Sequence, residues 1–167
     1  MAQSVFPDVS KPVKLATTSL SGASVTFSAI PGNHKTLFLR ITDVYLTSGD
    51  TVRMQINGST ASNYGDAGMR LAGTLGNQSS QGSWTLFYAD SDNTLTAAAE
   101  FYFPLYSTTN NIKSHYGWNM AGAYTDRVYN VGVNDLSAIC AAAITSITLF
   151  LSTETFSGGT ANLFGVN

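Results

Sequence analysis

Two aspartates, Asp90 and Asp92 in the segment ADSDNTLT, are the residues best spaced for binding a metal ion. Carboxylates at alternate positions open the calcium loop of an EF-hand, because Ca²⁺ is bound by several oxygen ligands. The glycine and the distal glutamate that complete such a loop are missing here. We therefore expect a solvated turn at this segment, and we keep a weak Ca²⁺ site in a β-loop as the alternative.

The two histidines, His34 and His115, are the other potential metal ligands of the chain. A protein metal site needs several ligands that converge on the ion. Neither histidine has a second potential ligand close to it in the sequence. The sequence therefore predicts no metal site and no cofactor.

Groups for acid–base or nucleophilic catalysis are scarce. Glu100 and Glu154 are the only glutamates, and most of the eight aspartates stand beside Gly, Ser or Asn, where Asp usually stabilises turns. No G-x-S-x-G motif is present, and the single cysteine, Cys140, has no recognisable histidine partner. We interpret Cys140 as a small buried residue, with a reactive thiol as the alternative. The sequence predicts no enzyme, and a small glycan-active enzyme is the competing hypothesis.

Aromatic residues lie among amides and glycines in the second half of the chain. Tyr116, Trp118 and Tyr124, with Tyr129 after them, are the main examples. Such rings can fill the core, anchor a protein interface, or stack on sugar rings. All three interpretations stay open on the sequence alone, so we treat the first three residues as candidate interface or glycan-binding aromatics.

Composition excludes several classes of partner. The chain has 167 residues, of which only 11% are charged, and its net charge is −2. A chain this long suits a single domain with a real core. The balance of charge provides no basic surface for nucleic acid or for anionic lipid. No apolar run is long enough to span a membrane, and no secretory leader is visible, so we expect synthesis in a cytoplasm.

Alternation of apolar and polar residues predicts an all-β fold. About eight or nine strands follow one another with turn residues between them, which favours an antiparallel β-sandwich of jelly-roll type. Pro104 indicates an edge strand or a bulge. The predicted inward sets are Val25 and Phe27; Leu37, Leu39 and Ile41; Trp84, Leu86 and Tyr88; Phe101, Phe103 and Leu105; and Ile147, Leu149 and Leu151.

The chain is predicted to divide into an N-terminal arm and one domain. Residues 1–19 are predicted to form an extended arm and residues 20–167 the single sandwich domain. Within the arm, apolar anchors for a neighbouring subunit would be Val5, Phe6, Pro7 and Val9, with a loose arm as the alternative. The strand TVRMQI should end in an Asn57-Gly58 turn, and the following STASNYGDAGMRLAG should be a surface loop or ribbon whose Tyr64 contacts a partner.

The order of several short motifs resembles a β-domain that recurs in virion proteins of tailed phages. The resemblance covers residues 20–167, with its distinctive motifs toward both ends. It is carried by Ile30-Pro31, Asn57-Gly58, Ser62-Asn63-Tyr64, the segment 144–150, the Phe156–Thr160 turn and the segment 163–165. The middle of the chain, around Trp84, Pro104 and Trp118, does not match distinctively.

The resemblance implies a non-enzymatic virion component. Such domains occur as decoration or cement proteins on the outside of the head, where they commonly form trimers and bind the major capsid protein. They also occur on tails and fibres that meet the host. The chain lacks a coiled coil and a collagen-like shaft, so head decoration is the expected function and the capsid surface the expected location. The alternative is a tail or fibre module that recognises a host surface glycan.

Overall fold

The fold consists of β-strands throughout the part of the chain that the structure describes. This computed structural model describes residues 11–62, 64–70, 75–89, 91, 96–109, 113–121, 124–134 and 142–167. No helix occurs within these ranges. The strands are β1 (Val13–Ser19), β2 (Ser24–Phe27), β3 (Thr36–Leu46), β4 (Asp50–Ile56), β5 (Tyr64–Arg70), β6 (Leu75–Gln81), β7 (Trp84–Ala89), β8 (Ala97–Pro104), β9 (Ser114–Ala121), β10 (Tyr124–Asn134), β11 (Ile147–Phe150) and β12 (Phe156–Val166).

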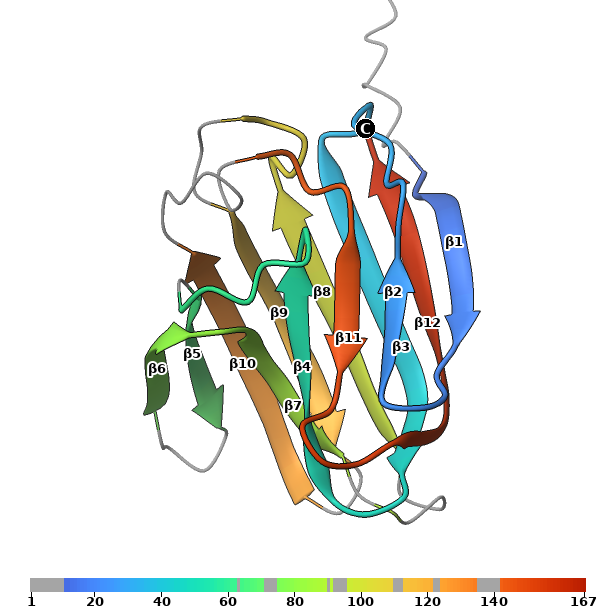
Figure 1. The fold of residues 1–167 in the computed structure, drawn as a ribbon, viewed down its shortest axis with the longest axis vertical. Coiled ribbons are helices and arrows are strands. Elements are labelled where there is room, and N and C mark those ends of the chain that lie inside the picture. The colour runs from blue at the N-terminus through green and yellow to red at the C-terminus, as the bar shows by residue number, and fades with distance from the viewer. Residues whose placement is uncertain are drawn as a thin grey trace, which may run out of the picture.

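These strands form two antiparallel sheets that pack face to face. The large sheet has the order β1-β12-β3-β8-β9-β10-β5-β6, and the small sheet has the order β2-β11-β4-β7. Figure 1 shows the small sheet lying across the large one, with β5 and β6 extending to one side. The predicted all-β sandwich is therefore confirmed.

The pairing is nested in the manner of a jelly roll. Strand β2 pairs with β11, β3 with β8, β4 with β7, and β5 with β6. Such nesting arises when one long hairpin rolls up into two sheets. The β9–β10 hairpin is inserted between β8 and β5, and β1 and β12 extend the large sheet beyond β3. The jelly-roll prediction is thus confirmed, with a hairpin added inside the large sheet.

More strands are described than the eight or nine expected. Residues 13–19, which were predicted to belong to the arm, form β1 and pair with β12. The predicted loop after Ile56 contains β5, and the Gly- and Ser-rich segment after it contains β6. Their composition is typical of turns, so only the pairing with β10 and with each other defines them as strands.

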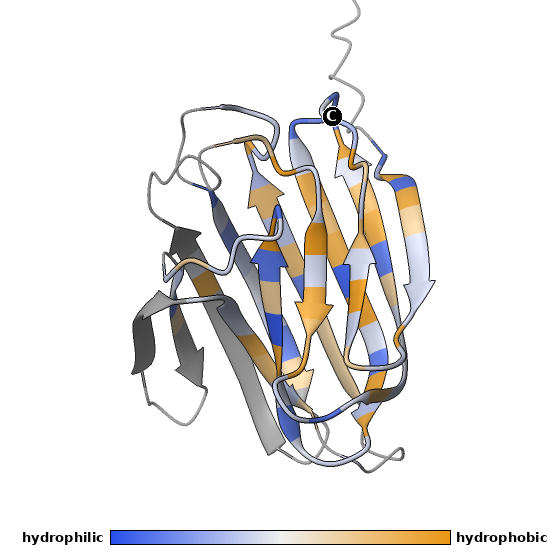
Figure 2. Ribbon diagram, viewed as in Figure 1, coloured by the Kyte–Doolittle hydropathy of each residue, from blue (hydrophilic) through white to orange (hydrophobic). Residues whose placement is uncertain are grey.

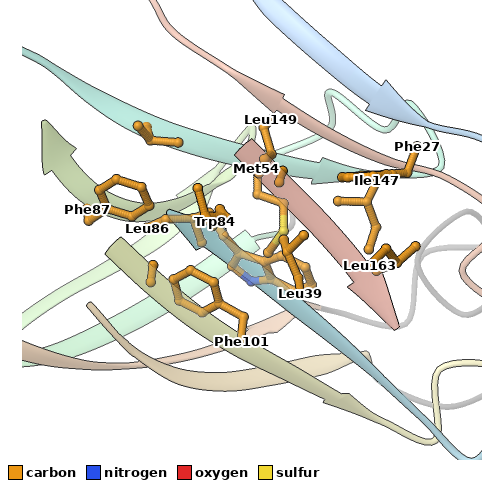
Figure 3. Packing of buried hydrophobic residues seen from close by; sticks show 14 of the residues in the cluster. Phe27, Leu39, Met54, Trp84, Leu86, Phe87, Phe101, Ile147, Leu149 and Leu163 are labelled. Carbon is orange, nitrogen blue, oxygen red and sulfur yellow. The ribbon is translucent and has the colours of Figure 1, made fainter. Parts of the chain in front are cut away.

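The core lies between the sheets, as the alternation predicted for most strands. Leu37, Leu39 and Ile41 are completely buried, and Ile147 and Leu149 are buried opposite them. Figure 2 shows hydrophobic and hydrophilic residues alternating along the strands. Figure 3 shows side chains of both sheets, among them Met54 and Phe101, converging in the space between them. Among the described residues, the hydrophobic core contains no ion pair. The burial of apolar surface is therefore the main interaction that stabilises the core.

Strand β7 departs from the predicted alternation. Its register with β4 shifts between Val52, paired with Phe87, and Arg53, paired with Thr85, which makes Leu86 an extra residue. Both Leu86 and Phe87 are therefore buried, and Tyr88 is exposed rather than inward. A bulge of this kind reverses the facing of every later residue in the strand, and local alternation cannot reveal it.

The end of β8 also differs from the prediction. Phe101 and Phe103 are buried, but Leu105 is exposed and has a positive φ of 51°. Pro104 is the last residue of β8, which lies inside the sheet between β3 and β9 and is not an edge strand. The described ladder to β9 ends at Tyr102, so no partner there requires an N–H from the proline.

The predicted Asn57-Gly58 turn is present after β4. Asn57 and Gly58 have φ values of 52° and 67°, and the Ser59 N–H donates to the Ile56 carbonyl at 3.0 Å. The Asn57 amide also binds a distant segment. Its Nδ2 donates to the Ala143 carbonyl at 2.9 Å, and its Oδ1 accepts from the Thr145 N–H at 2.8 Å. One side chain therefore fixes both its own turn and the approach to β11.

The Asp50 carboxylate organises the turn between β11 and β12. It accepts N–H hydrogen bonds from Thr51 at 2.6 Å, Ser152 at 3.1 Å and Thr153 at 3.2 Å. Burial acts to raise the pKa of Asp50, but the N–H donors together outweigh it and hold the pKa below its ordinary value of 3.8. The ionised carboxylate is therefore the form that the fold prefers.

This preference makes the contribution of Asp50 dependent on pH. We expect Asp50→Asn to lower the free energy of unfolding at pH 7 by about 1 kcal/mol, because the amide accepts these hydrogen bonds less strongly. A lowered folded pKa gives stability that is present above the unfolded pKa and is lost as pH falls through the folded pKa. Urea titrations at neutral and strongly acidic pH should therefore show the two proteins converging in acid. A constant difference at both pH values would contradict this role.

Candidate functional site

A row of aromatic side chains crosses the outer face of the large sheet. The register places Phe164 of β12 opposite Phe38 of β3, Phe38 opposite Tyr102 of β8, and Tyr102 opposite Tyr116 of β9. We call these four residues the aromatic ridge. Lys14 of β1 continues the row at one end, and Val131 of β10 continues it at the other. The ridge therefore connects strands from both ends of the chain.

Neighbouring rings of the ridge are stacked on each other. Their centroids are 5.5 Å apart for Phe164 and Phe38, 4.7 Å for Phe38 and Tyr102, and 5.3 Å for Tyr102 and Tyr116, with interplanar angles of 11–27°. Phe38 and Tyr102 thus each have a neighbouring ring on both sides. The Lys14 ammonium lies 5.9 Å from the centroid of Phe164 and covers the end of the ridge.

This stacking limits what the ridge can bind. A sugar ring binds an aromatic residue through the flat face of the ring. The faces of Phe38 and Tyr102 are already occupied by the neighbouring rings. Burial, the Glu100 carboxylate and Tyr116 together raise the pKa of Tyr102, so its hydroxyl stays neutral at physiological pH. The ridge is consequently suited to uncharged contact along ring edges, as at a protein interface.

A second row beside the ridge is polar. Arg40 Nε lies 3.4 Å from Glu100 Oε1, and Trp118 Nε1 donates to the other oxygen of Glu100 at 3.2 Å. Register places these three side chains directly across neighbouring strands. Glu100 thus binds a cation and an indole N–H at once. The polar atoms next to the ridge therefore have partners within this chain, and covering them costs less than covering unpaired groups.

The most exposed apolar side chains of this face lie on the inserted β9–β10 hairpin. Tyr116 is 51% exposed, Met120 46% and Val131 51%. Trp118 lies between the first two on β9, and we call these four residues the hairpin patch. Tyr116 and Val131 are direct cross-strand neighbours. Contiguous exposed apolar side chains of this kind mark interaction sites on soluble proteins.

The sequence predictions for aromatic residues have mixed outcomes. Tyr116 and Trp118 belong to the hairpin patch. Tyr124 begins β10, but its side chain lies outside the described residues. Tyr64 was predicted to contact a partner, and this is wrong, because it is completely buried. Its hydroxyl binds the carbonyls of Ile56 and Ser59, and its ring packs edge-on against Trp84 at 5.0 Å.

Three ridge residues were missed as functional candidates. Phe38 and Tyr102 belong to none of the predicted inward sets, and Phe164 was considered only within the motif segment 163–165. The available signal was an aromatic residue at an outward position in each of three strands. The predicted arm anchors Val5, Phe6, Pro7 and Val9 lie outside the described residues, as do Asp90, Asp92 and Cys140.

The potential catalytic and metal-binding groups that are described lie apart. His34 is buried near the end of β12, where its Nδ1 lies 2.7 Å from Asn167 Oδ1. His115 is buried between Trp84 and Phe101, with ring centroids at 4.6 and 5.5 Å. Glu154 accepts a hydrogen bond from Thr47 Oγ1. Within the described ranges, no three His, Cys, Asp or Glu side chains gather as they would around a metal ion.

The described residues also contain no helix long and apolar enough to cross a membrane. In comparisons with known proteins, no family model and no curated protein matches this chain. The candidate site therefore rests on the geometry of the outer face of the large sheet.

Proposed function

We propose that this chain is a non-enzymatic structural protein of a tailed-phage virion that decorates the outside of the capsid and cements its lattice. The observation that carries the proposal is the exposed aromatic face of the large sheet, in which Glu100 binds both Arg40 and Trp118. Such a face has the composition of an interface, rich in Tyr, Trp, Met and Arg. The resemblance of the end motifs to tailed-phage virion domains supports the same assignment.

The chemistry of the face supports passive contact. A cement protein stabilises an assembly because it binds the assembled lattice and not its dissociated parts. Many copies with modest contacts then stabilise the shell together. With a net charge of −2 and few charged residues, such contacts depend little on salt. The major capsid protein and other copies of this chain are the partners in this proposal.

Recognition of a host glycan is the competing function. It would require rings with open faces, and the two central rings of the ridge have both sides covered. The hairpin patch alone would have to hold the sugar, through Tyr116 and Trp118. This geometry supports a protein partner over a glycan, and a protein partner is what the cementing function requires.

Imaging and heating of particles test the cementing function. We expect labelled copies of this protein to cover the head in large number, and we expect heads lacking it to break at lower temperature than complete ones, because bound copies stabilise the assembled state. The measurements are electron microscopy of labelled particles and release of the packaged genome during a temperature ramp. Adding back the purified chain should restore the heat resistance.

Other outcomes would contradict the proposal. A few copies confined to the tail, together with binding on a host-glycan array, would favour host recognition. Equal heat resistance of complete and deficient heads would exclude cementing even if the protein lies on the head. Turnover of a glycan substrate would show that the chain is an enzyme.

A further inference from the structure

Three of the four edge strands, β7, β2 and β1, are poorly suited to pairing with another chain. On the free edge of β7, Asn119 Nδ2 donates to the Leu86 carbonyl at 3.1 Å, and Asp66 Oδ2 accepts from the Thr85 N–H at 2.7 Å. Strand β2, at the other edge of the small sheet, has only four residues. Strand β1 carries Lys14 and a register shift directly after it. Charges, bulges and short strands are features that prevent edge-to-edge association.

The outer face of the large sheet has the opposite character. Its hairpin patch exposes Tyr116, Met120 and Val131, and the aromatic ridge continues from that patch across four strands. The described side chains of β9 and β10 on this face include no Lys, Asp or Glu. Association through this face is therefore favoured over association through the edges of β7, β2 and β1.

The contact face is also of the size that an interface needs. The six strands that carry Lys14, the ridge and the hairpin patch, about 4.8 Å apart, make a face about 24 Å wide. Strands of seven to eleven residues are about 23–36 Å long at about 3.3 Å per residue. This part of the outer face thus covers about 550–860 Å², which is close to the roughly 800 Å² per partner of a standard interface.

Arg40 and Glu100, beside the ridge, carry opposite charges, so each can pair with its counterpart in a second copy of the chain. Arg40 is 56% exposed and Glu100 is 21% exposed, and they are neighbours on adjacent strands. A two-fold axis that lies in the interface, parallel to the strands and between these two residues, would place Arg40 of one copy over Glu100 of the other. In such an isologous contact each copy supplies both members of the pair, so no charge is buried alone. The small net charge adds little repulsion between copies.

We propose that two copies of this chain associate face to face through the hairpin patch and the aromatic ridge, forming a two-fold symmetric dimer. The proposal deepens the proposed function, since it names a second copy as one partner of the contact face. It requires no capsid for its test. A trimer, which the resemblance implies, would need head-to-tail contacts between different surfaces.

Sedimentation equilibrium of the full chain tests this dimer directly. The wild type should sediment as a dimer at micromolar concentration. Met120→Glu should raise the dimer dissociation constant by about 100-fold or more, because it brings two unpaired like charges into the contact. Thr148→Glu places the same charge on the outer side of the small sheet and should leave the dimer unchanged. Circular dichroism should show both variants folded.

A second variant tests whether the loss of the dimer in Met120→Glu has a cause confined to position 120. Val131→Lys, on the neighbouring strand, should also weaken the dimer, and raising the salt concentration should not restore it. A monomer at all concentrations would overturn the proposal, as would a trimer or a dimer that neither variant weakens. Binding of a wild-type monomer to heads would leave the cementing function standing while this dimer fails. Dimers that never bind heads would support this dimer and contradict the cementing function.

Discussion

Replacement of Trp84 by alanine is expected to lower the free energy of unfolding by about 3–5 kcal/mol, the range for removing a large buried aromatic side chain. Trp84 is completely buried at the start of β7. Its ring lies 4.6 Å from the ring of His115 and 5.0 Å from that of Tyr64. Gly132 lies so close beneath it that an added Cβ would stand 2.7 Å from Trp84 Cδ1. Removing the indole would therefore leave a cavity among closely packed groups.

The second tryptophan provides the matched control. Trp118 lies on the outer face and is only partly buried, so Trp118→Ala should cost less than about 1.5 kcal/mol, chiefly the hydrogen bond to Glu100. Urea titration followed by far-ultraviolet circular dichroism measures both variants without depending on tryptophan fluorescence. Should Trp84→Ala prevent folding, Trp84→Phe gives a smaller loss that can be measured. Equal losses for the two alanine variants would contradict the packing described here.

Asn57→Ala is expected to lower the free energy of unfolding by about 2.5–6.5 kcal/mol. Alanine is disfavoured at a positive φ by about 1–2 kcal/mol, and each lost hydrogen bond contributes about 0.5–1.5 kcal/mol. The lost bonds are those to Ala143, Thr145 and Ser146. Because these residues lead into β11, the central strands of the small sheet should lose amide protection as well. Hydrogen exchange measures that effect.

Two further variants separate the causes. Asn57→Gly removes the cost of the positive φ but also the hydrogen bonds, so it should be more stable than Asn57→Ala and less stable than the wild type. Asn57→Asp keeps an acceptor for Thr145 and Ser146 but loses the donor to Ala143. If glycine restored full stability, the side-chain bonds would contribute nothing and the bridging role would be wrong.

Local sequence patterns predicted those strands whose two faces differ strongly. Apolar and polar residues alternate regularly around Leu39 and Leu149, and both segments form strands that bury one face. The bulge at Leu86 depends on side chains from other strands, Asn119 and Asp66, so no pattern within β7 could indicate it. Strands β5 and β6 have the composition of loops, and only their partners define them.

The candidate site was predictable only in part, for a related reason. Tyr116 and Trp118 stand close together in the sequence and were recognised as a group. Phe38, Tyr102 and Phe164 lie far apart along the chain and become neighbours only through the register of β12, β3 and β8. Tyr64 was instead predicted to lie at the surface, because its neighbours in the sequence are polar. In the structure it is buried, and its hydroxyl binds the carbonyls of Ile56 and Ser59.

The nested pairing has a kinetic consequence. Strand β2 cannot find its partner until β11 has been synthesised, and β1 has to wait for β12, near the other end of the chain. Loop closure over such separations makes the folding barrier largely entropic. Small all-β domains with distant partners reach the native state in about milliseconds to seconds, far more slowly than helical bundles. During that time, the apolar segments of newly made copies are open to one another, so crowded synthesis favours aggregation over folding.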